Sequence, residues 1–517
     1  MKKIHISADW LLIAGFALFK FLIHLFTSTN YGLQRDAYLY LAQSHHLDFG
    51  FASVPPFTAL AGRFITLLAG NSPMAVRLLP ALAGAASLVV IGLIVKRLGG
   101  RTWAVILACG AFLFSPSFLR SNSLFQPVSF NQFFWLLSGY FIIRLIQSRN
   151  PACWLHLFIL WGVAFLNKYS IAFLAAGFLI SLLFARERRL FFSRYFLLGS
   201  LLGFLIVLPN LLWQFNHNWP VITHLTELQK TQLVHVTIPN FLLMQVIMNL
   251  TGVLVWTAGF FFFLFSGEGR RYRIIGYTVL ATFLILILLR GKFYYTLGLY
   301  SVLFAGGGYF IEKHSAERLR FVKPAILLFM AFISVPGLPY ALPVLKYDAL
   351  AKYAAGSIKA GFSEPMIWED GRVHSLPQDY ADMIGWKELG DIVTRTYLGL
   401  NGQERAGCVI YTENYGEAGA VRYFGERRGL PEPISFNDSF LLWAPDSLDR
   451  NFSTLIYVND DTSDVSHFFG EVRMVGQITN VYSREHGLPV FLCRYPRNNF
   501  AKFYREKAAE LKSLYRR

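Results

Sequence analysis

One carboxylate in the N-terminal part of the chain stands in a setting that suits acid–base chemistry. Asp36 follows Arg35 directly, and Tyr38 and Tyr40 come just after it. A positioned carboxylate can remove a proton from a hydroxyl group, and a neighbouring guanidinium favours the ionised carboxylate that this step needs. We therefore expect Asp36 to be a general base, with Arg35 and Tyr40 in the pocket for the group on which it acts. The structural alternative is that Asp36 only pairs with Arg35 and orders its loop.

A second group combines a lysine with phenol hydroxyls. Lys292 precedes Tyr294 and Tyr295 at the start of an apolar run. A lysine with two tyrosines offers one positive charge and two hydroxyl donors, which suits a phosphate group. The alternative is that Lys292 only extends from the apolar run towards water. The pattern predicts a phosphate cradle at residues 292–295.

Histidines in two long connections form a third group. His45 and His46 lie within residues 30–75, and His217 lies in a Trp-rich stretch that ends at Pro220. Long connections of this composition are partner surfaces or active-site lids, although tryptophans also mark the membrane interface. We place the three histidines in the pocket for the groups that react at Asp36. Apart from His45 and His46, which are adjacent and point apart, no pair of histidines has the spacing of metal ligands on a helix. The sequence therefore predicts no metal or other cofactor; a divalent metal ion is possible but unsupported.

Composition indicates what kind of protein carries these groups. Of the 517 residues, 54% are hydrophobic and only 15% are charged, whereas a soluble domain carries about 25% charged residues. The chain also has 49 Phe and 25 Tyr. These numbers exclude a disordered, collagen-like or coiled-coil protein and argue against a water-soluble enzyme.

Apolar stretches predict a mostly α, polytopic membrane protein with about eleven spans. A helix of about 20 apolar residues crosses a bilayer. The expected spans are residues 10–29, 76–95, 102–119, 129–146, 152–166, 169–185, 195–212, 240–264, 274–290, 295–311 and 323–342. Only Asn167 and Lys168 separate the fifth and sixth, so a broken or re-entrant pair is an alternative there. The first span lacks a cleavage site for a signal peptidase.

Basic residues predict the orientation of these spans. Residues 1–344 hold 27 Lys and Arg against 8 Asp and Glu, whereas residues 345–517 hold 21 against 23. Alternate connections carry 18 basic residues on one side and 8 on the other, which places the N-terminus in the cytoplasm of a cell with an inner membrane. The 345–517 segment is then periplasmic. Since the excess positive charge lies between apolar runs and not on a folded basic surface, we expect no nucleic-acid partner.

Three acids of the membrane part face outward in this arrangement: Asp36, Asp48 and Glu227. For Asp48 and Glu227 a solvated loop position is the simpler interpretation, whereas a carboxylate at the membrane interface among aromatic residues is typical of a functional group. Outward basic residues, one interfacial carboxylate and a membrane body together suit a lipid-phosphate substrate. The membrane itself is therefore a partner.

The segment after residue 344 predicts a separate soluble α/β domain. Residues 408–411 and 454–458 read as short buried strands followed by turn residues. The glycines at 416–419 do not form the G-x-G-x-x-G pattern of a dinucleotide site. Cys408 and Cys493 could form a bridge in this domain, but sequence does not show the geometry that a disulfide needs. We expect a membrane domain at 1–344 and an α/β domain at 345–517.

Several of these stretches, taken in order, resemble one family. They are RDAYLYLA at 35–42, PPFTAL at 55–60, RLLPALAG at 77–84, LFQPVSFN at 124–131, LNKYS at 166–170, WQFNHNWP at 213–220 and GKFYY at 291–295. The chain resembles the bacterial protein-O-mannosyltransferase-like membrane glycosyltransferases of the GT-C fold. Relatives of that family are the dolichyl-phosphate-mannose protein mannosyltransferases and the lipid A aminoarabinose transferases. The similarity covers residues 1–312 well and the remainder more weakly.

The resemblance implies roles for individual residues. The acid of the first outward loop is the catalytic base or positions the acceptor, and this role falls on Asp36. Lys168, Arg77 and Lys292 match positions that the family uses near the lipid phosphate. Two departures stand out: the family often has a second acid where this chain has Ala37, and it tends to have Asp where this chain has Asn131. Asn131 cannot act as a base, but it can hydrogen-bond in the sugar pocket.

The expected function is transfer of a sugar from a polyprenyl-phosphate-linked donor to an acceptor on the periplasmic side. The acceptor could be a lipid, a glycan or a protein. One alternative is a polytopic transporter or lipid flippase, although we find no internal repeat and few charges inside the spans. Another is a catalytically inactive family member, prompted by Ala37 and Asn131.

Overall fold

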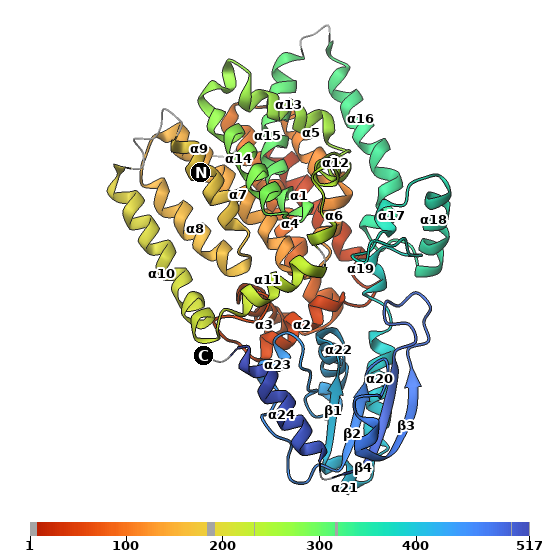
Figure 1. Cartoon of the computed structure of the whole chain (residues 1–517). Coiled ribbons are helices and arrows are strands. Elements are labelled where there is room, and N and C mark those ends of the chain that lie inside the picture. Colours follow the sequence, from red (N-terminus) through yellow and green to blue (C-terminus); the bar gives the residue numbers. More distant parts are fainter. Residues whose placement is uncertain (1–7, 184–191, 232, 316–318, 498, 516–517) are drawn as a thin grey trace, which may run out of the picture. The chain divides into compact units, whose positions relative to one another are not determined.

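The computed structural model describes residues 8–183, 192–231, 233–315, 319–497 and 499–515 (Figure 1). Its contacts divide the chain into two compact units. Unit 1 consists of Met1–Ser28, Met74–Pro209 and Leu228–Val344, and unit 2 of Thr29–Pro73, Asn210–Glu227 and Leu345–Arg517. Unit 2 thus combines the 345–517 segment with parts of the two long connections that the charge pattern assigns to the same side as that segment. The domain boundary at residue 344 stays a prediction.

Unit 1 is helical throughout its described part. Its helices are α1 (Ala8–Thr27), α4 (Pro73–Leu98), α5 (Thr102–Leu113), α6 (Pro116–Ser121), α7 (Pro127–Ser148), α8 (Cys153–Asn167), α9 (Ile171–Leu183), most of α10 (Arg194–Asn216), α12 (Ile238–Met248), α13 (Val253–Leu264), α14 (Arg273–Leu288), α15 (Leu297–His314), α16 (Val322–Ser334) and α17 (Leu338–Ala341). Short 3₁₀ turns, η2 (Leu233–His235), η3 (Glu268–Tyr272), η4 (Phe293–Thr296) and η6 (Val335–Gly337), connect some of them.

Five helices of the described residues are long and apolar enough to cross a membrane, or six if one bent pair counts as a span. The multi-pass helical character is therefore confirmed, while the total of eleven spans stays a prediction. Every range expected to span does contain helix, but two are interrupted. The range 102–119 changes helix at Pro116, because a residue before proline disfavours helical backbone. The range 240–264 is two helices, α12 and α13, bent by 111°.

The helices of unit 1 approach one another closely where small residues meet. A Cβ atom on Gly259 of α13 would lie 1.9 Å from the carbonyl oxygen of Leu303 in α15. A Cβ on Gly307 of α15 would lie 1.8 Å from the carbonyl oxygen of Val255. Contacts of this kind let helix backbones touch, which is how helices associate in a membrane that supplies no hydrophobic driving force between them.

Unit 2 contains the only sheet of the described residues. Two helices come from the first connection, α2 (Arg35–His45) and α3 (Phe57–Ala69), and α11 (Pro220–Thr231) begins in the second. Its other helices are α18 (Tyr347–Lys359), α19 (Gln378–Ala381), α20 (Trp386–Leu398), α21 (Gly402–Ala406), α22 (Tyr415–Gly425), α23 (Phe440–Trp443) and α24 (Phe500–Ser513), with 3₁₀ turns η7 (Glu364–Met366), η8 (Glu426–Arg428) and η9 (Ser466–Phe468). The strands are β1 (Cys408–Thr412), β2 (Thr454–Val458), β3 (Phe469–Gln477) and β4 (Pro489–Pro496).

The sheet has the order β1-β2-β4-β3, with β1 and β2 parallel and the other two pairings antiparallel. Both strands expected from sequence are present, so the α/β character of this segment is confirmed. Strands β3 and β4 were not predicted; β3 is half exposed and broken in register between Met474 and Gly476, which weakens its pattern in the sequence. The four cysteines, all within the described ranges, are free thiols, so Cys408 and Cys493 form no bridge.

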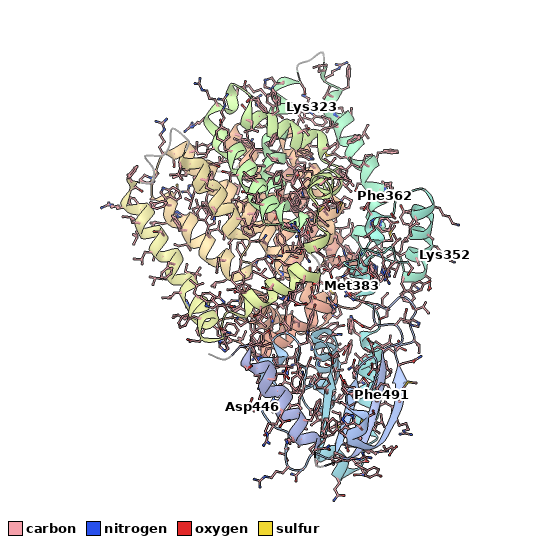
Figure 2. All side chains as sticks on the ribbon, viewed as in Figure 1. Lys323, Lys352, Phe362, Met383, Asp446 and Phe491 are labelled. Carbon is pink, nitrogen blue, oxygen red and sulfur yellow. The ribbon has the colours of Figure 1, made fainter. Side chains whose placement is uncertain are left out.

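Side chains from both halves of α24 hold this helix against the rest of unit 2. Lys512 of α24 donates to the Ala444 carbonyl and pairs with Asp446, at 2.7 Å; Figure 2 labels Asp446 in this position. Tyr504 of the same helix donates to the Pro445 carbonyl at 2.9 Å. These contacts tie α24 to the segment after α23, and Tyr504 and Ala508 also pack in one cluster with Val409 and Tyr411 of β1.

Candidate active site

Asp36 lies in the first turn of α2, where a carboxylate is favoured by the helix dipole. Gln34 caps this helix: its side-chain oxygen accepts a 2.8 Å hydrogen bond from the Asp36 backbone N–H. The Asp36 carboxylate therefore occupies a fixed position at a helix end, while its side chain remains 27% exposed. A fixed but accessible carboxylate is what a general base requires.

The side chain that holds Asp36 comes from the C-terminal segment. The Tyr415 hydroxyl, in the first turn of α22, donates a 2.8 Å hydrogen bond to Oδ1 of Asp36. Arg35 lies over the Tyr415 ring, 5.1 Å from its centroid, and its Nε is 3.8 Å from the same Oδ1. A Cβ atom on Gly416 would lie 2.4 Å from Cγ of Arg35, so only glycine admits the arginine here. The expected Arg35–Asp36 pair exists, and Tyr415 joins it.

A second carboxylate lies next to this group. Asp382 is 1% exposed at its side chain, accepts from Gln34 Nε2 at 3.4 Å and pairs with Arg484 at 3.4 Å. Its backbone carbonyl accepts from the Arg35 N–H at 3.0 Å. Burial raises the pKa of Asp382 to about 6, although Arg35 and Arg484 act in the opposite direction. Asp382 thus supports Arg35 and the N-terminus of α2 through both its backbone and its side chain.

The start of α22 is built to present Tyr415. Asn414 caps the helix, accepting from the backbone N–H groups of residues 416 and 417, while Glu417 bonds back to the Asn414 backbone. This capping box fixes where the helix begins. Burial raises the pKa of Glu417 well above its usual range.

The structure places the expected pocket residues of α2 and its neighbours mainly in packing contacts. Tyr40 is buried. His46 stacks on Trp443 at 4.2 Å and lies 2.6 Å from Glu432; burial and Arg422 lower the pKa of His46 to about 4. His45 lies 3.6 Å from Glu426. Their assignment to an acceptor or sugar pocket stays a prediction.

His217 belongs to a small cluster around Asp48. It stacks on Trp213 at 4.0 Å and bonds through Nδ1 to the Trp213 carbonyl, at 2.8 Å. The Trp213 indole N–H donates to Asp48 Oδ2 at 2.7 Å. Asp48 is thus a structural acceptor in unit 2, which agrees with the simpler interpretation of this acid.

In unit 1, the two expected phosphate-binding lysines converge on one tyrosine. Lys168, which ends α8, lies with its Nζ 5.3 Å from the ring of Tyr294 and 4.5 Å from that of Tyr295. Lys292 Nζ lies 6.0 Å from the Tyr294 ring. Lys168 and Tyr294, which are 126 positions apart in the sequence, therefore belong to one basic, aromatic group. Two ammonium groups near two tyrosine rings combine the charges and the hydroxyl-bearing side chains expected for a phosphate cradle.

Gln245 of α12 holds the turn that carries these tyrosines. Its amide donates to the Phe293 carbonyl at 3.2 Å and its oxygen accepts from Thr296 at 2.5 Å and from Tyr300 at 3.3 Å. Gln245 thereby holds both ends of the turn η4 and ties them to Tyr300 of α15. Nothing in the sequence pattern marked Gln245, because it lies in an apolar run with no neighbouring polar motif.

The remaining expected residues of unit 1 are buried. Asn131 in α7 is 3% exposed and accepts from the Ser170 hydroxyl at 3.4 Å. Arg77 in α4 is buried and donates to the carbonyl of Ser28, so it ties α4 to the end of α1. The placement of both residues near donor or sugar stays a prediction. Among the residues that the structure describes, no three His, Cys, Asp or Glu side chains gather as a metal ion would require.

Comparison with solved structures decides the fold. The crystal structure of ArnT from Cupriavidus metallidurans bound to undecaprenyl phosphate matches with a TM-score of 0.61 and 14% identity, over 94% of this chain and 98% of that one. The apo ArnT structure matches with a TM-score of 0.57 over the same shares. The chain has the GT-C glycosyltransferase fold.

Sequence comparison supports the GT-C assignment over shorter ranges. Residues 53–213 match the family described as dolichyl-phosphate-mannose-protein mannosyltransferase. The lipid A galacturonosyltransferase RgtD of Rhizobium johnstonii is 27% identical over 223 residues, which span 42% of this chain and 46% of RgtD. The chain therefore aligns with just under half the length of this curated relative. The resemblance to GT-C membrane glycosyltransferases drawn from the sequence motifs is confirmed.

The range that matches the family model contains only some of the residues that the sequence predicts to be functional. Arg77, Asn131 and Lys168 lie inside residues 53–213, whereas Asp36 and Lys292 lie outside them. The roles of Asp36 and Lys292 therefore depend on their own geometry. Tyr415 and Asp382 were missed because they come from the segment with the weakest resemblance.

Proposed function

We propose that the chain is a membrane glycosyltransferase that moves a sugar from a polyprenyl-phosphate-linked donor to an acceptor hydroxyl, with Asp36 as the general base. The observation that carries this proposal is the Asp36 carboxylate, fixed at a helix end by Gln34 and Tyr415 but still accessible. The names of the similar proteins support it: RgtD is a lipid A galacturonosyltransferase, and ArnT was crystallised with undecaprenyl phosphate.

The proposed reaction is a single displacement at the anomeric carbon. Asp36 takes the proton of the acceptor hydroxyl while the acceptor oxygen forms a bond to the anomeric carbon. The bond from that carbon to the donor phosphate oxygen breaks, and polyprenyl phosphate leaves with its extra negative charge. A positioned base contributes about 10²–10⁴-fold to such a step.

The basic group of unit 1 suits the other half of this reaction. The leaving phosphate gains charge as its bond to the sugar breaks, and the ammonium groups of Lys168 and Lys292 would stabilise that charge. The tyrosine hydroxyls at 294 and 295 would supply hydrogen-bond donors. The lipid tail of such a donor would stay in the membrane that the apolar helices of unit 1 require.

The partners and location follow from the same proposal. The acceptor is a lipid, glycan or protein that meets the donor at the membrane surface, and the RgtD name favours a lipid. The protein would sit in the inner membrane of a bacterium with its N-terminus in the cytoplasm and residues 345–517 in the periplasm. The proposal includes no metal ion and no nucleic-acid partner.

The decisive experiment is a product assay with a labelled polyprenyl-phosphate sugar and membrane lipids as acceptors. Asp36→Asn keeps the shape of the side chain and removes the base, so we expect turnover to fall at least about a hundredfold with donor binding retained. Asp48→Asn is the matched control, because Asp48 accepts structural hydrogen bonds from the Trp213 indole and from the Phe49 backbone N–H. Near-normal turnover in Asp36→Asn would refute the assignment of the base.

The same assay separates the alternatives. A transporter or flippase would move the lipid donor without forming product, and an inactive family member would bind donor without turnover. Ala37 and Asn131 prompt the second alternative, because the family often carries acids at these two positions. Product formation that depends on Asp36 would exclude both.

A further inference from the structure

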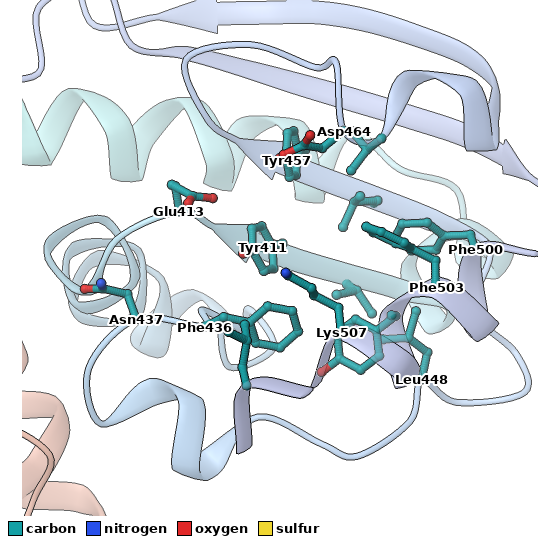
Figure 3. A pocket seen from close by; sticks show the side chains of 15 residues that line it. Tyr411, Glu413, Phe436, Asn437, Leu448, Tyr457, Asp464, Phe500, Phe503 and Lys507 are labelled. Carbon is teal, nitrogen blue, oxygen red and sulfur yellow. The ribbon is translucent and has the colours of Figure 1, made fainter. Parts of the chain in front are cut away.

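The α/β part of unit 2 contains a cavity of about 330 Å³ between its sheet and α24 (Figure 3). Val409 and Tyr411 of β1 and Leu455 and Tyr457 of β2 form its floor. These pairs are in register, so their side chains share the face of the sheet that α24 covers. Asp36, Arg35, Asp382 and Tyr415 do not line it, although Asn437, which does, accepts a 3.2 Å hydrogen bond from the Tyr415 backbone N–H.

Aromatic rings make up much of the cavity wall. The rings of Tyr411 and Tyr457 stack with their centroids 5.5 Å apart and an angle of 17° between their planes. Phe436 meets Tyr411 edge-on at 5.5 Å, and Phe500 and Phe503 of α24 lie towards the far end in Figure 3. The cavity thus offers flat apolar surfaces with phenol hydroxyls at their edges.

Polar groups gather at one end of the same cavity. Glu413 follows β1 directly, Asp464 lies in the loop after β2, and Asn437 and Lys507 complete this end. Because β1 and β2 are parallel, these groups lie where the carboxyl ends of two parallel strands meet, which is a common place for ligands in α/β folds. Burial and the neighbouring Asp464 raise the pKa of Glu413.

We propose that this cavity binds a sugar ring, as a saccharide site separate from the site at Asp36. A pyranose has an apolar C–H face that packs on an aromatic ring and a rim of hydroxyls that donate to carboxylates. The floor of Tyr411 and Tyr457 matches the face, and Glu413 and Asp464 match the rim. The volume is at the small end of ligand pockets, which suits one or two rings.

Other ligand classes fit the cavity less well. A phosphate or other anion would face two carboxylates against one lysine. A hydrocarbon chain would leave the polar end of the cavity without hydrogen-bond partners, which carries a desolvation cost. The described residues around the cavity do not form the cluster of acids and histidines that a metal ion needs.

The test uses the full chain in lipid nanodiscs prepared without glycosidic detergent, and no donor is added. The probes are cellobiose and the disaccharide of glucosamine, observed by saturation-transfer NMR and titrated by calorimetry. We expect transfer from protein aromatic protons to the sugar ring protons, and a dissociation constant about tenfold higher in Glu413→Gln. Glu506→Gln, which removes the same charge from the exposed side of α24, should leave it unchanged.

A milder variant guards against loss of folding. Tyr411→Phe keeps the ring and removes only the hydroxyl, so it should weaken sugar binding without changing the thermal unfolding temperature. Nanodiscs that contain a galactosyl lipid test whether the site takes a lipid-linked sugar or a free one. If it takes a lipid-linked sugar, the galactosyl lipid should compete with cellobiose from within the membrane. No transfer to either disaccharide, equal affinity in Glu413→Gln, or binding of decanol or inorganic phosphate in place of sugar would overturn the proposal. This binding assay needs no sugar donor. A negative result would therefore contradict the saccharide site without bearing on the proposed transfer reaction.

Discussion

The Tyr415 hydroxyl donates a 2.8 Å hydrogen bond to Oδ1 of Asp36, a residue 379 positions earlier in the chain. The first connection and the C-terminal segment therefore contribute to one group within unit 2. The bond orients the carboxylate, whose side chain stays 27% exposed. It gives the C-terminal segment a direct part in the proposed chemistry.

Tyr415→Phe should lower turnover without weakening donor binding. The variant keeps the ring under Arg35 but removes the hydroxyl that fixes Asp36, and a hydrogen bond to a charged group contributes about 1.5–3 kcal/mol, or about tenfold or more in rate. Steady-state kinetics should show a lower kcat with an unchanged KM for donor. Tyr397→Phe on α20 is the control. If Tyr415→Phe behaved like Tyr397→Phe, the bond would have no role in positioning the base.

Asp382 should make the stability of unit 2 depend on pH. Burial raises the pKa of Asp382 from 3.8 to about 6, so between these values the folded protein keeps a proton that the unfolded chain has lost. Stability therefore falls as pH rises from 4 to 6, by about 3 kcal/mol in total, and this contribution is absent above pH 6.

Asp382→Asn provides the measurement. Other acids titrate in the same range, so the comparison is between the two pH profiles of thermal unfolding temperature, followed by tryptophan fluorescence. The wild-type profile should decline from pH 4 to 6 more steeply than that of the variant. Asp391→Asn, at an exposed ion pair, serves as control. Parallel profiles for wild type and Asp382→Asn would show that Asp382 is ionised throughout this range.

Local signals in the sequence were enough for the helical membrane part, for strands β1 and β2 and for the pair of Arg35 and Asp36. Each depends on short-range patterns: long apolar runs, alternating buried residues, or adjacent charges. Lys168 and Lys292 were each identified alone, and only the fold shows that both reach Tyr294.

The partners of Asp36 could not be found in this way. Tyr415 is one of 25 tyrosines, and nothing near it in sequence indicates that its hydroxyl reaches residue 36. Asp382 appears in sequence as an ordinary polar residue, and its burial results from the packing of distant segments. Hydropathy also could not show that Pro116 interrupts one apolar run or that α12 and α13 bend by 111°, because it ignores backbone direction.

Reporter fusions at residues 270 and 400 should report opposite sides of the membrane. The expectation follows from the 18-to-8 distribution of basic residues between alternate connections. Residue 270 lies in a basic connection assigned to the cytoplasm, and residue 400 lies in unit 2. A phosphatase reporter that is active only in the periplasm should be silent at 270 and active at 400. The same signal at both positions would contradict the predicted topology.

Removing the ammonium groups near Tyr294 should weaken donor binding. Lys168→Ala and Lys292→Ala each remove one of the two positive charges that lie near the Tyr294 ring. We therefore expect each variant to lose about tenfold in affinity for polyprenyl phosphate. Because both lysines approach one ring, their effects should be coupled: the double variant should lose less than the product of the two single losses. Binding of labelled polyprenyl phosphate in nanodiscs gives the three affinities.

The control for this prediction is Lys230→Ala, which removes a basic residue assigned to the same side of the membrane from the exposed end of α11. Its affinity should match the wild type. Tyr294→Phe adds a further distinction, since it keeps the ring that both lysines approach and removes the hydroxyl donor. If the ammonium groups bind phosphate directly, Tyr294→Phe should cost less than either lysine variant. Wild-type affinity in both lysine variants would mean that these side chains only extend towards the membrane surface, and the phosphate would then have to be held elsewhere.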